Sequence, residues 1–242
     1  MVKEVQVTGN EGHRMGRSLL RDFILGGQDG LVNVLGIVLG VATAVSDVKI
    51  IVIAGLSATF AESISMGAVA YTSSKAAASF YRSEFEREKR EIEEIPEMEK
   101  QEVREIFQKK GLQGEMLEQV VKIITADKKV WLQTMMAEEL RLFPDDYEDP
   151  AKSGIIVFFA AMIGSIIPLF PFFLVPSLIP SLGLAIAISI AFSAIMLFIG
   201  GWYTAMVTTG NKLKSGAEMA LIGFLAAIVG YVIGKLLGSV YV

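Results

Sequence analysis

The chain has 242 residues, of which 52% are hydrophobic, and its mean hydropathy is +0.52. That composition is too apolar for a soluble domain of this length. The absence of cysteine excludes disulfides, thiolate metal sites and cysteine nucleophiles. The one histidine, His13, lies in the polar N-terminal segment, so a His-rich zinc site and a Ser-His-Asp triad within the fold are excluded as well.

The net charge of −4 conceals an uneven distribution of charged residues. Residues 80–150 contain 19 of the 26 acidic residues and 12 of the 22 basic residues. The sequence therefore describes an apolar protein with one acidic, polar insert. Such an insert does not favour a nucleic acid as partner, because nucleic-acid binding depends on Lys and Arg contacts to phosphates.

Five apolar stretches are long enough to cross a bilayer, which takes about 20 residues per helix. We therefore predict an all-α membrane protein with five transmembrane helices and a cytoplasmic, helical, metal-binding domain between the second and third. The predicted spans are residues 22–45, 50–74, 153–175, 181–207 and 216–242. The predicted domains are a polar leader (1–20), the first two spans (21–79), the insert (80–150) and the last three spans (151–242).

Basic residues outside the spans predict the orientation. They gather in the leader, in the insert and in Lys212 and Lys214, whereas the two opposite loops contain only Lys49. The positive-inside rule then places the N-terminus and the insert in the cytoplasm. The leader has no short apolar run before a small-residue cleavage site, so it is not predicted to be a secretory signal. A cell membrane and a vacuole-type membrane fit this pattern equally.

Acidic residues interrupt the first two spans. Asp29 lies about 10 Å beyond Asp22 along the first helix, and the i,i+7 spacing puts both on one face. Glu62 in the second span is followed four residues later by Met66, so a carboxylate and a thioether share a helix face. Because an ionised carboxylate at membrane depth is costly, these residues favour a cation path. The alternative is that Asp29 lies near the headgroups or caps a helix break at Gly30.

The insert is predicted to form polar helices with a small core. The second transmembrane helix meets no breaker before Pro96, so it should continue out of the membrane to about residue 95. Further helices are expected at 97–110, from about residue 114, and from about 127 to 143. Apolar residues at helical spacing would supply the core. These residues are Val103, Ile106, Phe107, Val120, Val121 and Ile124.

Paired acidic residues lie on either side of Pro96. Glu88 and Glu91 precede it, Glu99 and Glu102 follow it, and each pair has i,i+3 spacing. A reversal of the helix at Pro96 would bring one pair opposite the other. Carboxylates hold hard or borderline divalent cations. The alternative is a solvated face stabilised by pairs of Glu with Lys or Arg.

The last helix of the insert combines a thioether with a carboxylate. Met135 and Glu139 have i,i+4 spacing, as Glu62 and Met66 do in the membrane. A thioether ligand shifts the preference of a site toward transition metals. Methionines at helical spacing are, however, more often core residues.

Taken together, three motifs resemble the vacuolar iron transporter family. They are RDFILGGQDGL in the first span, AESISMG with the following Lys75 in the second, and PEMEKQEVREI with VWLQTMMAEEL in the insert before a Pro-rich third span. The resemblance runs from about Arg21 to the C-terminus. It implies a homodimer that exports Fe²⁺, and also Mn²⁺, Zn²⁺ or Co²⁺, from the cytosol in exchange for protons. It implies neither a prosthetic group nor an enzymatic activity.

The resemblance also implies roles for particular residues. The membrane path would contain Asp22, Asp29, Glu62 and Met66. The metal ligands of the insert would be Glu88, Glu91, Glu99, Glu102, Met135 and Glu139. One departure is the run of three alanines after Lys75, where relatives often have an acidic residue.

Other functions stay open on the sequence. A membrane-anchored metal-binding sensor or a passive divalent-cation channel would use the same residues. A membrane-anchored iron oxidase is disfavoured, because di-iron sites of helical bundles usually use Glu-x-x-His motifs and this chain has none.

Overall fold

The computed structural model describes residues 11–144, 147, 149–208 and 210–241, and these form helices and connecting turns without a strand. Residues 1–10 of the predicted leader therefore lie outside the described residues. The chain divides into two compact units, Met1–Tyr71 with Ala151–Val242 (unit 1) and Thr72–Pro150 (unit 2). The helices are α1 (Glu11–Ala44), α2 (Val48–Glu94), α3 (Pro96–Lys109), α4 (Gly114–Thr125), α5 (Lys128–Glu138), α6 (Pro150–Phe173), α7 (Leu182–Val207) and α8 (Lys212–Tyr241).

Five of these helices are long and apolar enough to cross a membrane, which confirms the predicted number of spans. They are Leu20–Ala44 of α1 together with α2, α6, α7 and α8. The start of the last span was predicted four residues too late. Asn211 caps α8, because its side-chain oxygen accepts a hydrogen bond of 3.1 Å from the Lys214 amide, so the helix begins within the predicted loop.

Helix α2 continues without a break for 47 residues, from the second span into the insert. This matches the expectation that no residue before Pro96 stops it. The residue before a proline is disfavoured in the helical conformation, and Ile95 accordingly separates α2 from α3.

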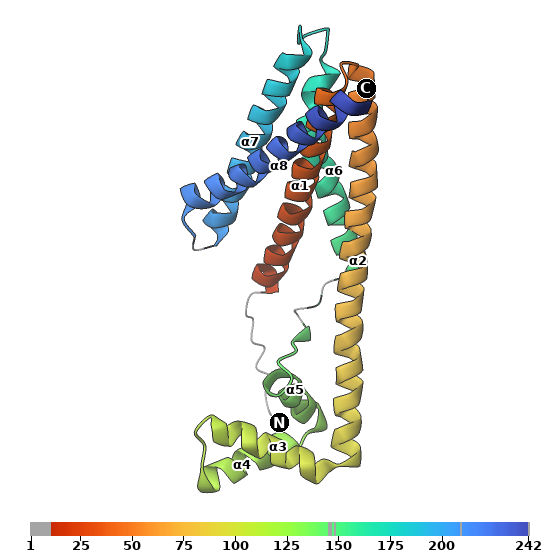
Figure 1. Ribbon diagram of the computed structural model, residues 1–242. Helices are drawn as coiled ribbons and strands as arrows, with labels where there is room; N and C mark the ends of the chain where they lie inside the picture. The colour runs from red at the N-terminus through yellow and green to blue at the C-terminus, as the bar shows by residue number, and fades with distance from the viewer. Residues whose placement is uncertain (1–10, 145–146, 148, 209, 242) are drawn as a thin grey trace. The chain divides into compact units, whose positions relative to one another are not determined.

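Glycines bring the first and last spans into backbone contact. Gly36 and Gly40 of α1 lie against Gly230 and Gly234 of α8, where a Cβ on either α8 glycine would collide with an α1 carbonyl oxygen. We call these four residues the glycine seam. Figure 1 shows α8, in blue, crossing α1. Small residues at i,i+4 spacing are how membrane helices approach closely, since lipid supplies no hydrophobic force between them.

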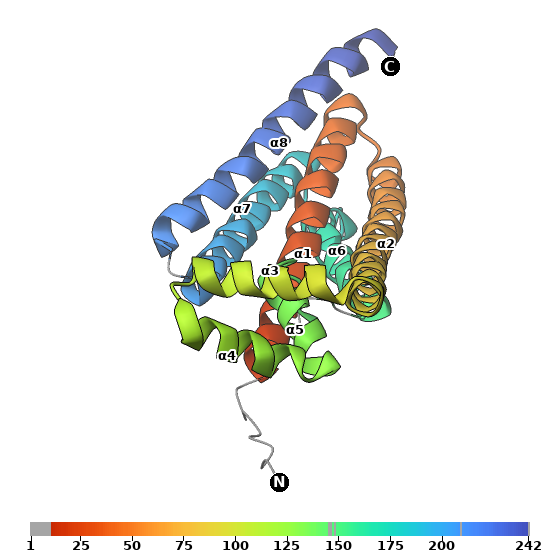
Figure 2. The ribbon, with the colours of Figure 1, turned by 90° about the horizontal axis from the view of Figure 1, so that it is seen from below.

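Unit 2 has a core of its own. Figure 2 shows α3 and α4 side by side. The turn between them begins at Gly111, whose φ of 98° suits glycine. The Gly111 amide donates to the Gln108 carbonyl and the Leu112 amide to the Phe107 carbonyl, which is the Schellman pattern of a helix end. The buried core consists of Ile92, Val103, Leu117, Val121, Trp131, Leu132, Met135 and Met136.

The last helix of the insert ends earlier than predicted. Helix α5 stops at Glu138 rather than near Phe143. The chain turns at Arg141, whose φ is 56°, and the Leu140 and Leu142 amides donate to carbonyls of α5. The prediction placed the end of the helix before Pro144, and no glycine or proline marks the earlier turn in the sequence.

Candidate functional site

Three carboxylates from three elements of unit 2 meet at one point. Glu88 of α2, Glu99 of α3 and Glu139, which directly follows α5, each offer an oxygen atom, and these oxygens lie within 4.8 Å of one another. We call this group the carboxylate cluster. Glu88 and Glu99 are 1% and 2% exposed, whereas Glu139 is exposed. Glu88 Oε1 and Glu99 Oε2 are buried without a hydrogen-bond partner, which is costly for a polar atom unless a proton or a cation meets it.

The local sequence explains this convergence. Glu88 lies one turn before the core residue Ile92, and Glu99 lies one turn before the core residue Val103. Each carboxylate therefore shares the buried face of its helix. The break at Pro96 separates the two helices, and Glu139 is held as the C-terminal cap of α5.

The cluster is electrostatically unusual. Burial raises the pKa of Glu88 to about 8, and the neighbouring Glu99 carboxyl adds to the rise. Burial, together with repulsion from Glu102 and Glu99, raises the pKa of Glu139 to about 7. The pKa of Glu99 is also raised, mainly by burial. A group of carboxyls in this state binds protons when it is empty and can exchange them for a cation.

The remaining predicted ligands of the insert differ in their surroundings. Glu91 and Glu102 are half-buried and act electrostatically on it, as the pKa shifts of Glu99 and Glu139 show. Met135 is fully buried in the core of unit 2. Its role as a sulfur ligand stays a prediction, since its burial also fits the alternative of a core methionine.

The surface of unit 2 carries ordinary ion pairs, as the alternative of a solvated face expects. Arg87 pairs with Glu84 at 2.7 Å and with Glu91 at 3.7 Å, and Lys100 pairs with Glu97 at 2.7 Å. Such exposed pairs contribute about 1 kcal/mol or less. Among the described residues, no Lys or Arg lies close enough to a member of the carboxylate cluster to form an ion pair with it. The acidic residues thus divide into paired surface groups and a buried cluster.

The raised pKa values predict that the ion-free protein loses stability as pH rises. A carboxyl whose pKa is higher in the folded than in the unfolded chain stabilises the fold fully below about pH 4.5, and this contribution is lost by about pH 8, the pKa of Glu88. We expect the melting temperature of unit 2, measured with a chelator present, to fall across this range. Trp131 lies in the core of unit 2, so its fluorescence in a Trp202→Phe background reports the transition.

A matched pair of variants identifies the source of that pH dependence. Glu88→Gln should make the melting temperature depend less on pH, because it removes the carboxyl whose pKa is raised most. Glu93→Gln, an exposed acid of the same helix, should leave it unchanged. A melting temperature that rises with pH would contradict the assignment.

A second polar group lies between the first two spans, in unit 1. The Asn33 side chain of α1 donates a hydrogen bond from Nδ2 to Glu62 Oε1 of α2. The Asp29 carboxyl of α1 also acts electrostatically on Glu62. Asp29, Glu62 and Met66 are half-buried, and Asn33 is exposed. We call Asp29, Asn33 and Glu62 the membrane triad.

The structure separates Asp22 from this triad. Asp22 is 3% exposed and accepts a hydrogen bond of 2.5 Å from the Ser153 hydroxyl of α6, while Arg21 approaches it at 3.4 Å. Sequence reasoning grouped Asp22 with Asp29 by face, but Asp22 contacts α6 and Asp29 contacts α2. It left Asn33 out of the site, although the i,i+4 spacing from Asp29 was a visible signal.

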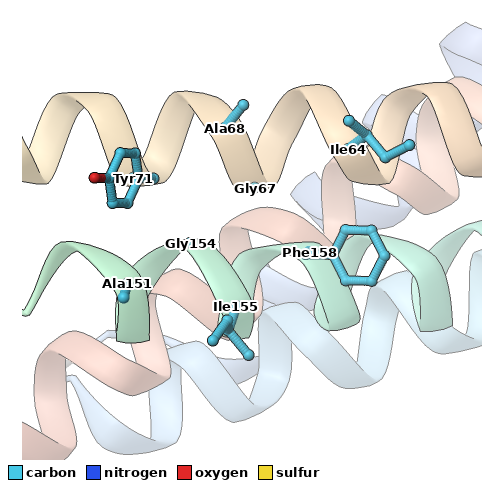
Figure 3. Close-up of a pocket in the computed structure, with 8 residues that line it drawn as sticks. All are labelled: Ile64, Gly67, Ala68, Tyr71, Ala151, Gly154, Ile155 and Phe158. Carbon is cyan, nitrogen blue, oxygen red and sulfur yellow. The ribbon is translucent and has the colours of Figure 1, made fainter.

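A groove in unit 1 has a different chemistry. It has a volume of about 350 Å³ and lies between α2 and α6 (Figure 3). Tyr71 contributes the one polar side chain of its lining, so the groove has no carboxylate that could bind a metal. The lining residues are Ile64, Gly67, Ala68, Tyr71, Ala151, Gly154, Ile155 and Phe158.

Five apolar helices, with carboxyl groups gathered between two of them and in a polar insert, define a multi-pass α-helical membrane protein. The chain belongs to the VIT family, whose sequence profile matches residues 20–235. It is 31% identical over 225 residues to Vacuolar iron transporter 1 of Arabidopsis thaliana, covering 93% of this chain and 88% of the relative. It is 32% identical over 232 residues to the Vacuolar iron transporter of Plasmodium berghei, covering 94% and 85%.

These comparisons confirm the resemblance seen in the motifs. Vacuolar iron transporter 1 of Tulipa gesneriana is 30% identical over 230 residues, covering 95% of this chain and 92% of the relative. Matches of this extent cover both the spans and the insert. Family membership also identifies a transporter rather than an enzyme.

Proposed function

We propose that this protein exports Fe²⁺ from the cytosol across a membrane in exchange for protons, and that it also carries Mn²⁺ and other divalent transition metals. The observation that carries the proposal is the membrane triad, which joins two carboxyl groups at membrane depth. The three relatives described above are named vacuolar iron transporters, which supports iron as cargo.

The chemistry of the triad supports the exchange. Two neighbouring carboxyls repel each other when both are ionised. Either a proton or a divalent cation relieves that repulsion between Asp29 and Glu62. Because a carboxylate must be ionised to bind a metal, the two ions compete for one place, and their fluxes become coupled. Met66, one turn beyond Glu62, would add a softer ligand that favours transition metals over Ca²⁺.

The carboxylate cluster would collect metal before transport. In this proposal Glu88, Glu99 and Glu139 are the inner ligands, and Glu91, Glu102 and Met135 complete the set. The insert and the N-terminus then lie on the cytosolic side, as the distribution of basic residues predicts. The membrane is that of a cell or of a vacuole.

The exposed side chain of Asn33 in unit 1 supports a homodimer. Asn33 is exposed although it lies about 20 Å along the span that begins at Leu20, at a rise of about 1.5 Å per residue. A polar side chain at that depth is costly against lipid. A second copy that covers this face of α1 would shield the triad and enclose an aqueous path.

Metal uptake into proteoliposomes tests the function. The purified protein is reconstituted, Fe²⁺ is supplied without oxygen, and uptake is followed with and without a pH gradient for Fe²⁺, Mn²⁺, Co²⁺ and Zn²⁺. We expect a gradient with the acidic side opposite the metal to accelerate uptake. Uptake that ignores the gradient would indicate a passive channel, and metal binding without uptake would indicate a sensor.

A further inference from the structure

We propose that Asn33 belongs to the ion path, where its side-chain amide holds Glu62 in place and offers its carbonyl oxygen to the cation. This inference rests on the proposed function. It assigns a specificity-determining role to a residue outside the set of carboxylates and thioethers predicted from the sequence.

A hydrogen bond between side chains joins α1 to α2 at Asn33. Asn33 Nδ2 donates to Glu62 Oε1, so the amide links the path residues of α1 to those of α2. Asp29 lies one turn before Asn33, and Met66 lies one turn after Glu62. Each helix therefore presents two potential ligands at i,i+4 spacing, and the Asn33–Glu62 bond joins the two pairs.

A polar side chain at the position of Asn33 carries a free-energy cost within a membrane span. Asn33 is the one primary amide between Asp29 and the end of α1 at Ala44, in a segment made otherwise of apolar residues, glycine and one threonine. Its exposure near the middle of a span would be unfavourable in lipid. An aqueous path explains that exposure, whereas a role in packing alone does not.

The hydrogen bond to Glu62 fixes the orientation of the Asn33 amide. A carboxylate can only accept, so the NH₂ group must face Glu62, and the carbonyl oxygen Oδ1 stays available as a ligand. An amide oxygen adds coordination without adding charge. Carbonyl oxygen suits Mn²⁺ better than Zn²⁺, which prefers nitrogen and sulfur. Asn33 should therefore favour Mn²⁺, with borderline Fe²⁺ between the two metals.

Metal binding and transport together test the role. Both are measured on the full chain carrying Glu88→Gln and Glu99→Gln, which disable the carboxylate cluster and leave the membrane site to report. Asn33→Leu should weaken Mn²⁺ binding by calorimetry about tenfold or more, the usual effect of losing a hydrogen bond to a charged group. It should raise the half-saturating Mn²⁺ concentration for uptake equally and affect Zn²⁺ less.

Two further variants complete the design. Gln28→Leu removes an amide from the same helix at a neighbouring position and should leave both metals unaffected. Asn33→Ser, whose shorter side chain cannot reach Glu62, should reproduce the Asn33→Leu effect even if the leucine variant does not assemble. Equal changes for Mn²⁺ and Zn²⁺, or no change in either Asn33 variant, would overturn the role of Asn33. Weaker Mn²⁺ binding in these variants, in a protein that transports nothing, would keep Asn33 as a metal ligand beside Glu62 but would overturn the proposed function and the ion path that rests on it.

Discussion

Asp29→Asn should abolish Fe²⁺ uptake into proteoliposomes, with a loss of at least about a hundredfold, because ligand losses exceed the tenfold to hundredfold effects of residues that only orient ligands. The substitution keeps the shape of the side chain but removes its charge and its titration. In the proposed exchange, both the cation and the proton would then lose their place beside Glu62. Initial rates with and without a pH gradient provide the measurement.

The loop between the first two spans offers a matched control. Asp47 accepts a hydrogen bond of 2.8 Å from the Lys49 amide, and asparagine serves equally well as an N-terminal cap. Asp47→Asn should therefore transport like the unchanged protein. Asp29→Asn protein that reconstitutes normally and keeps its full Fe²⁺ flux would rule out the membrane triad as the transport site.

The joint substitution Glu88→Gln and Glu99→Gln should eliminate metal binding by the insert. Both carboxylates are almost fully buried, and each has an oxygen without a partner, so a cation would lose two inner ligands. Equilibrium dialysis with Mn²⁺ or Co²⁺ should show fewer bound ions per chain. Transport at saturating metal should persist, because the membrane triad is untouched.

The same variant should be more stable without metal at pH 8 than the unchanged protein. Removing two carboxyls with raised pKa removes the energetic cost of ionising them in a buried place. This opposite change in binding and stability separates a metal site from a structural one. Glu93→Gln with Glu97→Gln, on the same two helices but exposed, should leave metal binding unchanged and should cost only the surface ion pairs with Lys128 and Lys100, about 1 kcal/mol or less each. If the cluster variant bound as many ions as before, the ligands would have to lie elsewhere.

Much of the fold could be predicted from hydropathy and helix breakers. The five spans follow from apolar length, and the long α2 follows from the absence of any breaker before Pro96. The end of α5 could not be predicted, because Arg141 adopts a positive φ without the glycine that usually signals it.

The candidate sites could be predicted only in part. The i,i+3 pairs around Pro96 contain Glu88 and Glu99, which meet in the carboxylate cluster, and Glu91 and Glu102, which act on it electrostatically. Contacts between spans were harder to predict from the sequence, because they depend on the register of one helix against another. That register turns Asp22 toward Ser153 and brings Asn33 to Glu62, although Asp22, Asp29 and Asn33 occupy one helix.

The glycine seam has a consequence for how the protein is made. A ribosome releases α1 first and α8 last, so these two helices meet only when synthesis is nearly complete. Until then Gly36 and Gly40 lack the backbone of α8 against which they pack. A nascent chain truncated after α7 would leave this glycine face of α1 without its partner helix.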